Sequence, residues 1–124
     1  MKFTSFHPLI VTKDSASAIA TFEAMGFVRN HCITVNSSGK DITTVCMKDA
    51  DGHHVDVTQI DGMPQDLTLI RVNVDNFEEA YEFLLSKGFT NPKGDHTVDT
   101  KTNKSCMMRS PSGFAFDLCQ HIKD

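Results

Sequence analysis

The sequence predicts an α+β fold of two tandem β-α-β-β-β modules, which together form a curved, mostly antiparallel sheet of eight strands. Two helix endings predict the duplication, because "AIATFEAMGF" ends its helix at Gly26 and "AYEFLLSKGF" does so at Gly88, 62 residues later. Two hairpin segments, "MKDADGHHVDVTQ" and "MRSPSGFAFDLCQ", also align, with an offset of 61 residues. Two copies of one supersecondary unit are therefore expected, the first at 1–62 and the second at 63–124.

Each module is expected to begin with a strand and to place three more strands after its helix. "HPLIVT" (7–12) and "LIRVNV" (69–74) are rich in branched apolar residues, which is typical of strands. "DADG" and "SPSG" join the last two strands of the modules, since glycine accepts the positive φ of a tight hairpin. With both helices on the convex side, the sheet leaves a concave cavity that a ligand, a partner chain or its own side chains must fill.

Capping residues and apolar stripes predict the two helices. Asn76 is the expected N-cap of the second helix, with Glu79 at the capping-box position, and Asp14 or Ser15 begins the first helix. The stripes expected to face the core are Ile19, Phe22 and Met25 in the first helix and Phe77, Ala80, Tyr81 and Leu84 in the second.

Composition and charge narrow the class of protein. The chain has 124 residues, a net charge of −4 and basic residues without a cluster, which argues against a nucleic-acid partner. Apolar runs such as "PLIV" are too short to cross a bilayer, and the N-terminal stretch lacks the apolar segment of a signal peptide, so we expect a cytoplasmic protein without a membrane partner. No Cys-x-x-Cys pair occurs, which predicts four reduced and buried thiols at Cys32, Cys46, Cys106 and Cys119.

Alternation along the strands separates core residues from cavity residues. Ile70, Val72 and Val74 form the apolar set of their strand, so the residues between them should face the cavity. Phe114, Phe116 and Leu118 are expected in the core in the same way. The side chains predicted to face the cavity include His7, Leu9, His54, Asp56, Leu69, Arg71, Asn73, Asp117 and Cys119.

These modules resemble the vicinal oxygen chelate superfamily, which includes glyoxalase I, extradiol dioxygenases and the bleomycin- and fosfomycin-resistance proteins. The resemblance covers nearly the whole chain and consists of the module layout, the helix-Gly-Phe junction and the final hairpin. Metal-binding members usually place one ligand at the start of each module's first strand and another on its last strand. By position these are His7 and Leu69, then Asp56 and Asp117.

The resemblance does not decide whether this chain binds a metal. Leu69 has no donor atom, and Asp56 and Asp117 stand where glutamate is usual in metal-binding members. The resemblance therefore implies either no cofactor or a divalent metal (Zn, Ni, Mn or Fe) held by His7, Asp56 and Asp117.

Arg71 is the more informative cavity residue. A guanidinium aimed at a concave face costs free energy unless an anion answers it. The anion is either Asp56 or Asp117, in an internal ion pair, or a carboxylate or phosphate of a ligand.

Two functional hypotheses follow, with a third beside them. The favoured one is a glyoxalase/bleomycin-resistance-like protein that binds a small, anionic organic molecule without an intact metal site, through His54, Arg71, Asn73, Leu9, Leu69 and Cys119. The alternative is a metal-dependent lyase/isomerase or dioxygenase of the glyoxalase type, in which Asp56 or Asp117 is the catalytic base. The third is a regulatory or structural module whose cavity is filled at a subunit contact. The resemblance implies a homodimer and leaves open whether the modules pair within one chain or across a swapped dimer.

Overall fold

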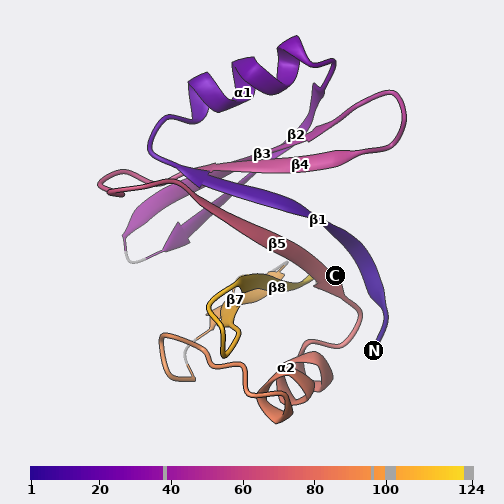
Figure 1. Cartoon of the computed structure of the whole chain (residues 1–124), viewed down its shortest axis with the longest axis vertical. Coiled ribbons are helices and arrows are strands. Elements are labelled where there is room, and N and C mark those ends of the chain that lie inside the picture. Colours follow the sequence, from indigo (N-terminus) through magenta and orange to yellow (C-terminus); the bar gives the residue numbers. More distant parts are fainter. Residues whose placement is uncertain (38, 96, 100–102, 122–124) are drawn as a thin grey trace. The chain divides into compact units, whose positions relative to one another are not determined.

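The computed structural model describes residues 1–37, 39–95, 97–99 and 103–121. Within these residues it contains eight strands and two helices in the order β-α-β-β-β, twice, so the α+β class and both modules are confirmed (Figure 1).

The chain divides into two compact units. One unit is His7–Thr68, and the other joins Met1–Phe6 to Leu69–Asp124. The first strand, β1 (Phe3–Thr12), therefore gives its first residues to one unit and its remainder to the other.

The unit His7–Thr68 is a four-stranded sheet with one helix. Its strands lie in the order β2-β3-β4-β1, with β1 and β4 parallel and the other two pairs antiparallel. After β1 its elements are α1 (Ser15–Ala24), β2 (Val28–Ser37), β3 (Lys40–Lys48) and β4 (His54–Gln59). In Figure 1, α1 lies over the strands of this unit. The buried side chains packed between helix and sheet are Ile19, Val45, Met47, Val55 and Val57.

The start of α1 follows the prediction and its end does not. Asp14 is the N-cap, and its Oδ1 accepts a hydrogen bond from the Ser17 N–H at 3.1 Å. Ile19 is buried, but Met25, predicted to continue the apolar stripe, exposes 66% of its surface. The helix ends at Ala24 and Met25 is its C-cap, so the chain turns away before the stripe reaches that residue.

The second unit has the same plan. Its strands lie in the order β5-β8-β7-β6, with β5 and β8 parallel and the other pairs antiparallel. Its elements are β5 (Leu67–Val74), α2 (Phe77–Ser86), β6 (Val98–Asp99), β7 (Asn103–Arg109) and β8 (Ala115–His121). Its buried core is Val72, Val74, Phe77, Ala80, Leu84, Cys106, Met108 and Leu118.

Both ends of α2 are fixed by local chemistry. Asn76 Oδ1 accepts a hydrogen bond from the Glu79 N–H at 3.1 Å, as the capping pattern predicts. Gly88 then takes a φ of +88°, and a Cβ at this position would lie 3.0 Å from Pro111 Cγ. Glycine is needed here both for the left-handed backbone and for the close approach of the proline.

Two other burial predictions are wrong. Phe114 was expected in the core but exposes 54% of its surface, because β8 begins only at Ala115 and Phe114 belongs to the preceding turn. Cys32 was expected to be buried but is exposed on β2, the edge strand of its unit, whereas Cys46, Cys106 and Cys119 are buried.

Candidate functional site

His7 and Asp56 meet on adjacent parallel strands of the unit His7–Thr68. Val55 and Val57 point into the core of this unit, so Asp56 points to the opposite face of β4. The β1–β4 register pairs Leu9 with Asp56, and His7 lies two residues earlier on the same face of β1. The distance from His7 Nε2 to Asp56 Oδ2 is 2.9 Å, and the two side chains expose only 12% and 4% of their surface.

The neighbours of this pair on the same strands are partly polar. The His54 ring lies 5.7 Å from the His7 ring, centre to centre, but His54 is exposed to solvent. Thr58 is buried and shares a hydrogen bond of 2.7 Å with Thr44. Leu9 is buried at 4% exposure. The predicted cavity residues of this unit therefore share a strand face, with His54 at its exposed end.

Arg71 and Asp117 form the corresponding pair in the second unit. The parallel strands β5 and β8 place them directly opposite each other in register. Arg71 Nε donates a hydrogen bond to Asp117 Oδ2 at 2.9 Å, and the side chains expose 15% and 16% of their surface. The sequence allowed Asp56, Asp117 or a ligand anion as the partner of Arg71. The structure contains the internal ion pair with Asp117.

Asn73 and Cys119 follow this pair along the same two strands. The register pairs them, and both are buried. Asn73 donates a hydrogen bond from Nδ2 to Ser5 Oγ, and Cys119 Sγ lies 3.6 Å from Asp117 Oδ2. Burial, and then the nearby Asp117 carboxylate, raise the pKa of Cys119 well above its ordinary value. The thiol therefore stays protonated near neutral pH and is a poor nucleophile.

The residues at the superfamily's ligand positions fit a complete metal site poorly. His7 and Asp56 offer two donor atoms close together, but the side chain of Leu69 has none. The Asp117 carboxylate already accepts a hydrogen bond from the Arg71 guanidinium. Leu69 supplies no donor, so the intact four-position set is not present, and at most three of its positions carry a donor, which is the lower limit for a divalent ion such as Zn²⁺.

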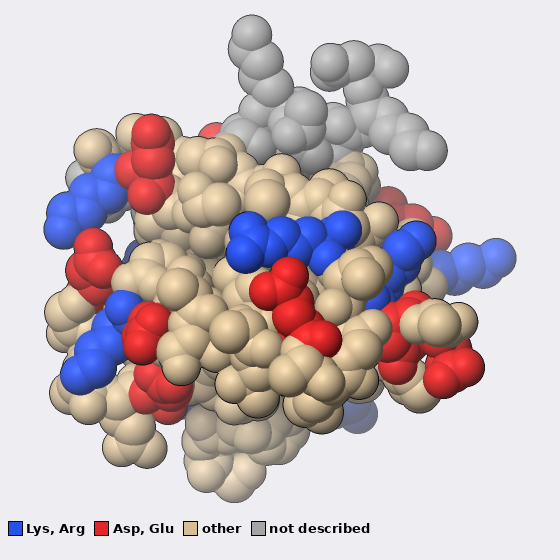
Figure 2. Space-filling view, turned by 90° about the horizontal axis from the view of Figure 1, so that it is seen from above, with Lys and Arg blue, Asp and Glu red and all other residues tan. Residues whose placement is uncertain are grey.

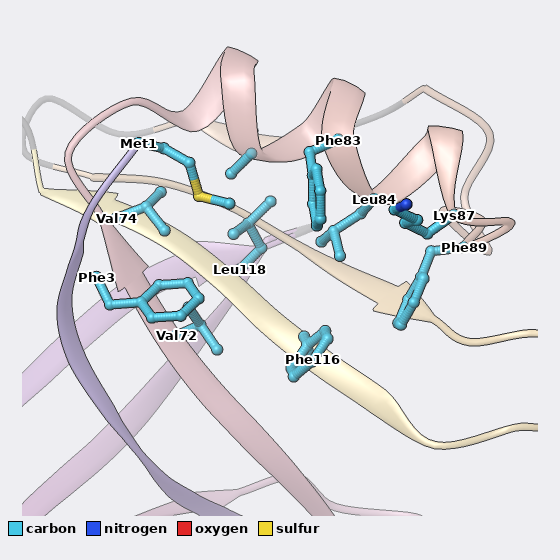
Figure 3. Close-up of a pocket in the computed structure, with 11 residues that line it drawn as sticks. Met1, Phe3, Val72, Val74, Phe83, Leu84, Lys87, Phe89, Phe116 and Leu118 are labelled. Carbon is cyan, nitrogen blue, oxygen red and sulfur yellow. The ribbon is translucent and has the colours of Figure 1, made fainter.

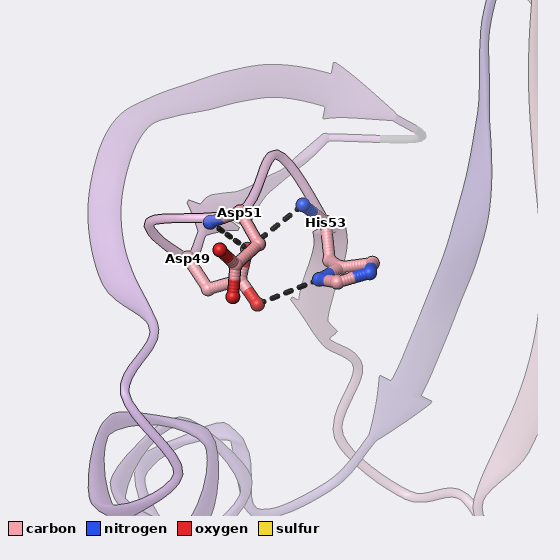
Figure 4. Close-up of side chains that lie close together, drawn as sticks. All are labelled: Asp49, Asp51 and His53. Atoms are coloured by element: carbon pink, nitrogen blue, oxygen red, sulfur yellow. Dashed lines mark hydrogen bonds and ion pairs between the residues drawn. The ribbon is translucent and has the colours of Figure 1, made fainter.

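A second group of possible metal ligands, which was not predicted, lies in the hairpin between β3 and β4. One donor atom from each of Asp49, Asp51 and His53 lies within 4.8 Å of the others (Figure 4). Asp49 Oδ1 also accepts hydrogen bonds from the backbone N–H groups of Asp51 and His53, at 3.0 and 2.8 Å. Asp49 Oδ2 lies 2.7 Å from His53 Nδ1. The hydrogen bonds of the turn thus explain why these three side chains lie together. In the sequence, the Asp-x-Asp-x-His spacing is the signal that indicates this group.

Charge is mixed on the face of the molecule drawn in Figure 2, where Lys and Arg side chains lie among Asp and Glu side chains. Within the part of the chain that is described, neither helix is long and apolar enough to span a membrane.

Comparison of the fold with solved structures gives three informative likenesses. A glyoxalase/bleomycin resistance protein/dioxygenase superfamily member from Vibrio splendidus 12B01 aligns with a TM-score of 0.63 at 16% identity, over 98% of this chain and all of the other. A methylmalonyl-CoA epimerase aligns with a TM-score of 0.67 at 17% identity, over 94% of both chains. Glyoxalase I from Zea mays aligns with a TM-score of 0.66 at 15% identity, over 98% of this chain and 44% of the maize chain.

Sequence comparison finds no matching family model and no matching curated protein. The fold likeness nevertheless extends over nearly the whole chain and includes both modules. The chain has the fold of the glyoxalase/bleomycin resistance/dioxygenase superfamily, which is the vicinal oxygen chelate fold that its sequence resembles.

Proposed function

We propose that this chain binds a small organic molecule carrying a carboxylate or a similar anionic group, and that binding does not require a metal. The observation that carries the proposal is the low exposure, between 4% and 16%, of four ionisable side chains on strand faces turned away from the helices: His7, Asp56, Arg71 and Asp117. Taking such groups out of water costs free energy, and folds that retain them commonly use them at functional sites.

Arg71 is the proposed anchor for the anion. Its Nε is held by Asp117, which fixes the plane of the guanidinium on β5. A fixed guanidinium recognises a carboxylate or phosphate with less loss of side-chain entropy than a lysine would. Asn73 and Leu69 lie on the same face of the strand, and they supply an amide and an apolar contact for a ligand of mixed character.

The metal-free form of the proposal depends on Leu69. Leu69, the third residue of β5, removes one of the four expected ligands, and both last-strand positions hold aspartate, which reaches one methylene less far than glutamate. The prediction that the polar faces of the two units enclose one cavity stays a prediction.

Titration calorimetry with lactate, malonate and inorganic phosphate tests the anchor. We expect Arg71→Ala to weaken binding of the anion that binds best by about 10- to 100-fold, since hydrogen bonds between charged groups contribute about 1.5–3 kcal/mol each. Arg109→Ala is the matched control, because Arg109 is an exposed arginine of the same unit. Equal affinities of the two variants for the anion, with both variants folded, would refute the assignment.

The second candidate function is a metal-dependent lyase/isomerase or dioxygenase of the glyoxalase type. The pair of His7 Nε2 and Asp56 Oδ2 favours it, because these two atoms, which share a hydrogen bond of 2.9 Å, are ligand types that such ions accept. Metal analysis of protein purified without a histidine tag separates the two candidates. Stoichiometric Zn, Ni, Mn or Fe that His7→Ala removes would establish the metal protein, and its absence after soaking with these ions would favour the metal-free binder.

The proposed assembly is a homodimer. Met25 and Val28, at the end of α1 and the start of β2, expose 66% and 57% of their surface and offer apolar area for a subunit contact. Sedimentation velocity over a range of concentrations tests this, and a monomer at every concentration would contradict it.

A further inference from the structure

An apolar cavity of about 270 Å³ lies beneath α2 in the second unit (Figure 3). Its deep wall is made by buried side chains of three elements, Val72 and Val74 from β5, Leu84 from α2 and Leu118 from β8. The cavity is larger than an engineered apolar cavity of about 150 Å³ that stays dry and binds benzene. It therefore has room for an organic ligand, which would enter through its open side and lie against an apolar wall.

The mouth of the cavity has a different character. Phe3 and Phe83 line it and expose 60% and 47% of their surface. Lys87, at the C-cap of α2, is the charged side chain of the lining, and its Nζ lies 5.6 Å from the centre of the Phe83 ring. Among the described residues no carboxylate forms an ion pair with this ammonium group. The apolar interior thus opens beside Lys87, while the other cationic group near the lining, the α-ammonium group of Met1, is already paired with the Glu79 carboxylate.

This cavity is separate from the face that carries Arg71. Val72 and Val74 point from β5 toward α2, so Arg71 and Asn73, which alternate with them, point the other way. A ligand beneath α2 would therefore not contact the Arg71–Asp117 pair.

We propose that the cavity beneath α2 binds the hydrocarbon chain of an unbranched medium-chain fatty acid, with its carboxylate at Lys87. By comparison with the cavity of about 150 Å³ that binds benzene, which has six carbon atoms, a cavity of about 270 Å³ holds a chain of roughly ten carbon atoms. An apolar wall favours a chain without polar groups, and the exposed ammonium group at the mouth favours an anionic end. The aromatic rings beside Lys87 cover the first methylenes next to the carboxylate.

A chain-length series is the direct test, by calorimetry at concentrations below micelle formation. Burial of each added methylene should tighten binding about fourfold, so decanoate should bind roughly 15-fold more tightly than octanoate, and octanoate by the same factor over hexanoate. Dodecanoate should gain little more because the cavity is then full. An affinity independent of chain length from six to ten carbons would overturn the proposal.

Variants locate the site. Lys87→Gln should weaken octanoate binding about two- to fivefold, as expected for an exposed ion pair, and leave the binding of octanol unchanged. Lys93→Gln is the matched control, because Lys93 is an exposed lysine of the same unit away from the cavity. Ala80→Leu should fill the cavity and reduce octanoate binding at least tenfold, with folding checked by circular dichroism.

Three further results also support or overturn the fatty-acid site. Arg71→Ala should leave octanoate binding unchanged, so failure of the anion site proposed above and failure of this one are distinguishable. Equal effects of Lys87→Gln and Lys93→Gln would overturn the position of the carboxylate. A dimer whose formation excludes octanoate would also overturn the proposal, because the occupant of the cavity would then be a second copy of this chain.

Discussion

Gln120 at the end of β8 is expected to fasten the start of α2, and its removal should be costly. Its Oε1 accepts a hydrogen bond from the Phe77 N–H at 2.6 Å, and its Nε2 donates one to the Asp75 carbonyl at 3.0 Å. The Phe77 N–H belongs to the first turn of the helix and has no partner within it. Because Phe77 is 2% exposed, water cannot readily replace the glutamine.

The magnitude follows from these two bonds. A hydrogen bond contributes about 1 kcal/mol net, so Gln120→Ala should lower the free energy of unfolding by about 2 kcal/mol. For a domain of this length that loss corresponds to a decrease in Tm of roughly 6–8 °C. Gln120→Glu keeps the acceptor and loses the donor, so it should fall between Gln120→Ala and the unchanged protein.

Urea unfolding followed by circular dichroism measures the effect. Gln65→Ala is the control, because Gln65 is an exposed glutamine whose side chain forms no hydrogen bond with another described residue. If Gln120→Ala and Gln65→Ala differ by less than about 0.5 kcal/mol, the argument that Gln120 anchors the helix is wrong.

Three more predictions concern a histidine, the cysteines and the core. A hydrogen bond to Asp49 raises the pKa of His53 above 6.5, so the pair stabilises the fold at pH below 6.5 and this contribution is lost as the pH rises through the raised value. In an NMR titration, Asp49→Asn should return the pKa of His53 toward 6.5, and an unchanged titration would contradict the pairing. A thiol reagent at pH 8 should label the exposed Cys32 quickly but spare Cys106, because burial raises the pKa of that thiol to about 12; equal rates would be contrary evidence. Met108→Ala should cost about 2–5 kcal/mol in urea unfolding, because Met108 is fully buried and its loss leaves a cavity, and a loss below 1 kcal/mol would show that the core collapses around it.

Local chemistry made the helices predictable. The N-cap side chains of Asp14 and Asn76 act within three residues of their own position, so their role can be read from a short window of sequence. The helix ends are harder, because Met25 continues the apolar spacing in sequence after the backbone has already left the helix. The prediction for Phe114 is wrong for a similar reason, because the alternating sequence pattern begins one residue before β8 does.

Pairing over long distances set the limit of the sequence prediction. Alternation placed Arg71 on the face opposite the core, but the choice of its partner needed the parallel register of β5 and β8, which pairs it with Asp117. Likewise, the hydrogen bond between Ser5 and Asn73 joins residues 68 positions apart. Nothing in the apolar pattern near residue 5 indicates that partner.

The duplication shows which constraints belong to the fold. Gln59 in the first module repeats the role of Gln120, because its Oε1 accepts a hydrogen bond from the Ser15 N–H at 2.7 Å, at the first residue of α1. The same side chain at the same place in both modules performs the same task, which is to hold a helix to the end of the last strand. This pair was visible in the aligned hairpin segments, but its partners were not, because they lie more than 40 residues away.

The carboxylates of the two modules occupy equivalent positions and have different partners. Asp56 meets His7 in the middle of β1, whereas Asp117 meets the arginine that lies directly opposite it on β5. The two first strands differ in a complementary way, since His7 aligns with Leu69 and Leu9 aligns with Arg71 at the offset of 62. Each strand thus carries one polar and one apolar side chain on this face, in opposite order.

The opposite order of the polar and the apolar side chain on the two first strands affects which ligand the protein can bind. A metal site that uses both modules alike would need a donor on the first strand of each module, and in the second module this position is Leu69, which has none. The exchange instead gives the first module an imidazole–carboxylate pair and the second a guanidinium–carboxylate pair. The guanidinium–carboxylate pair suits the anionic end of a ligand, and each of the two pairs lies beside a leucine of its own strand. The residues that differ between the two modules therefore support a metal-free binder, whereas the residues that the modules share determine the fold.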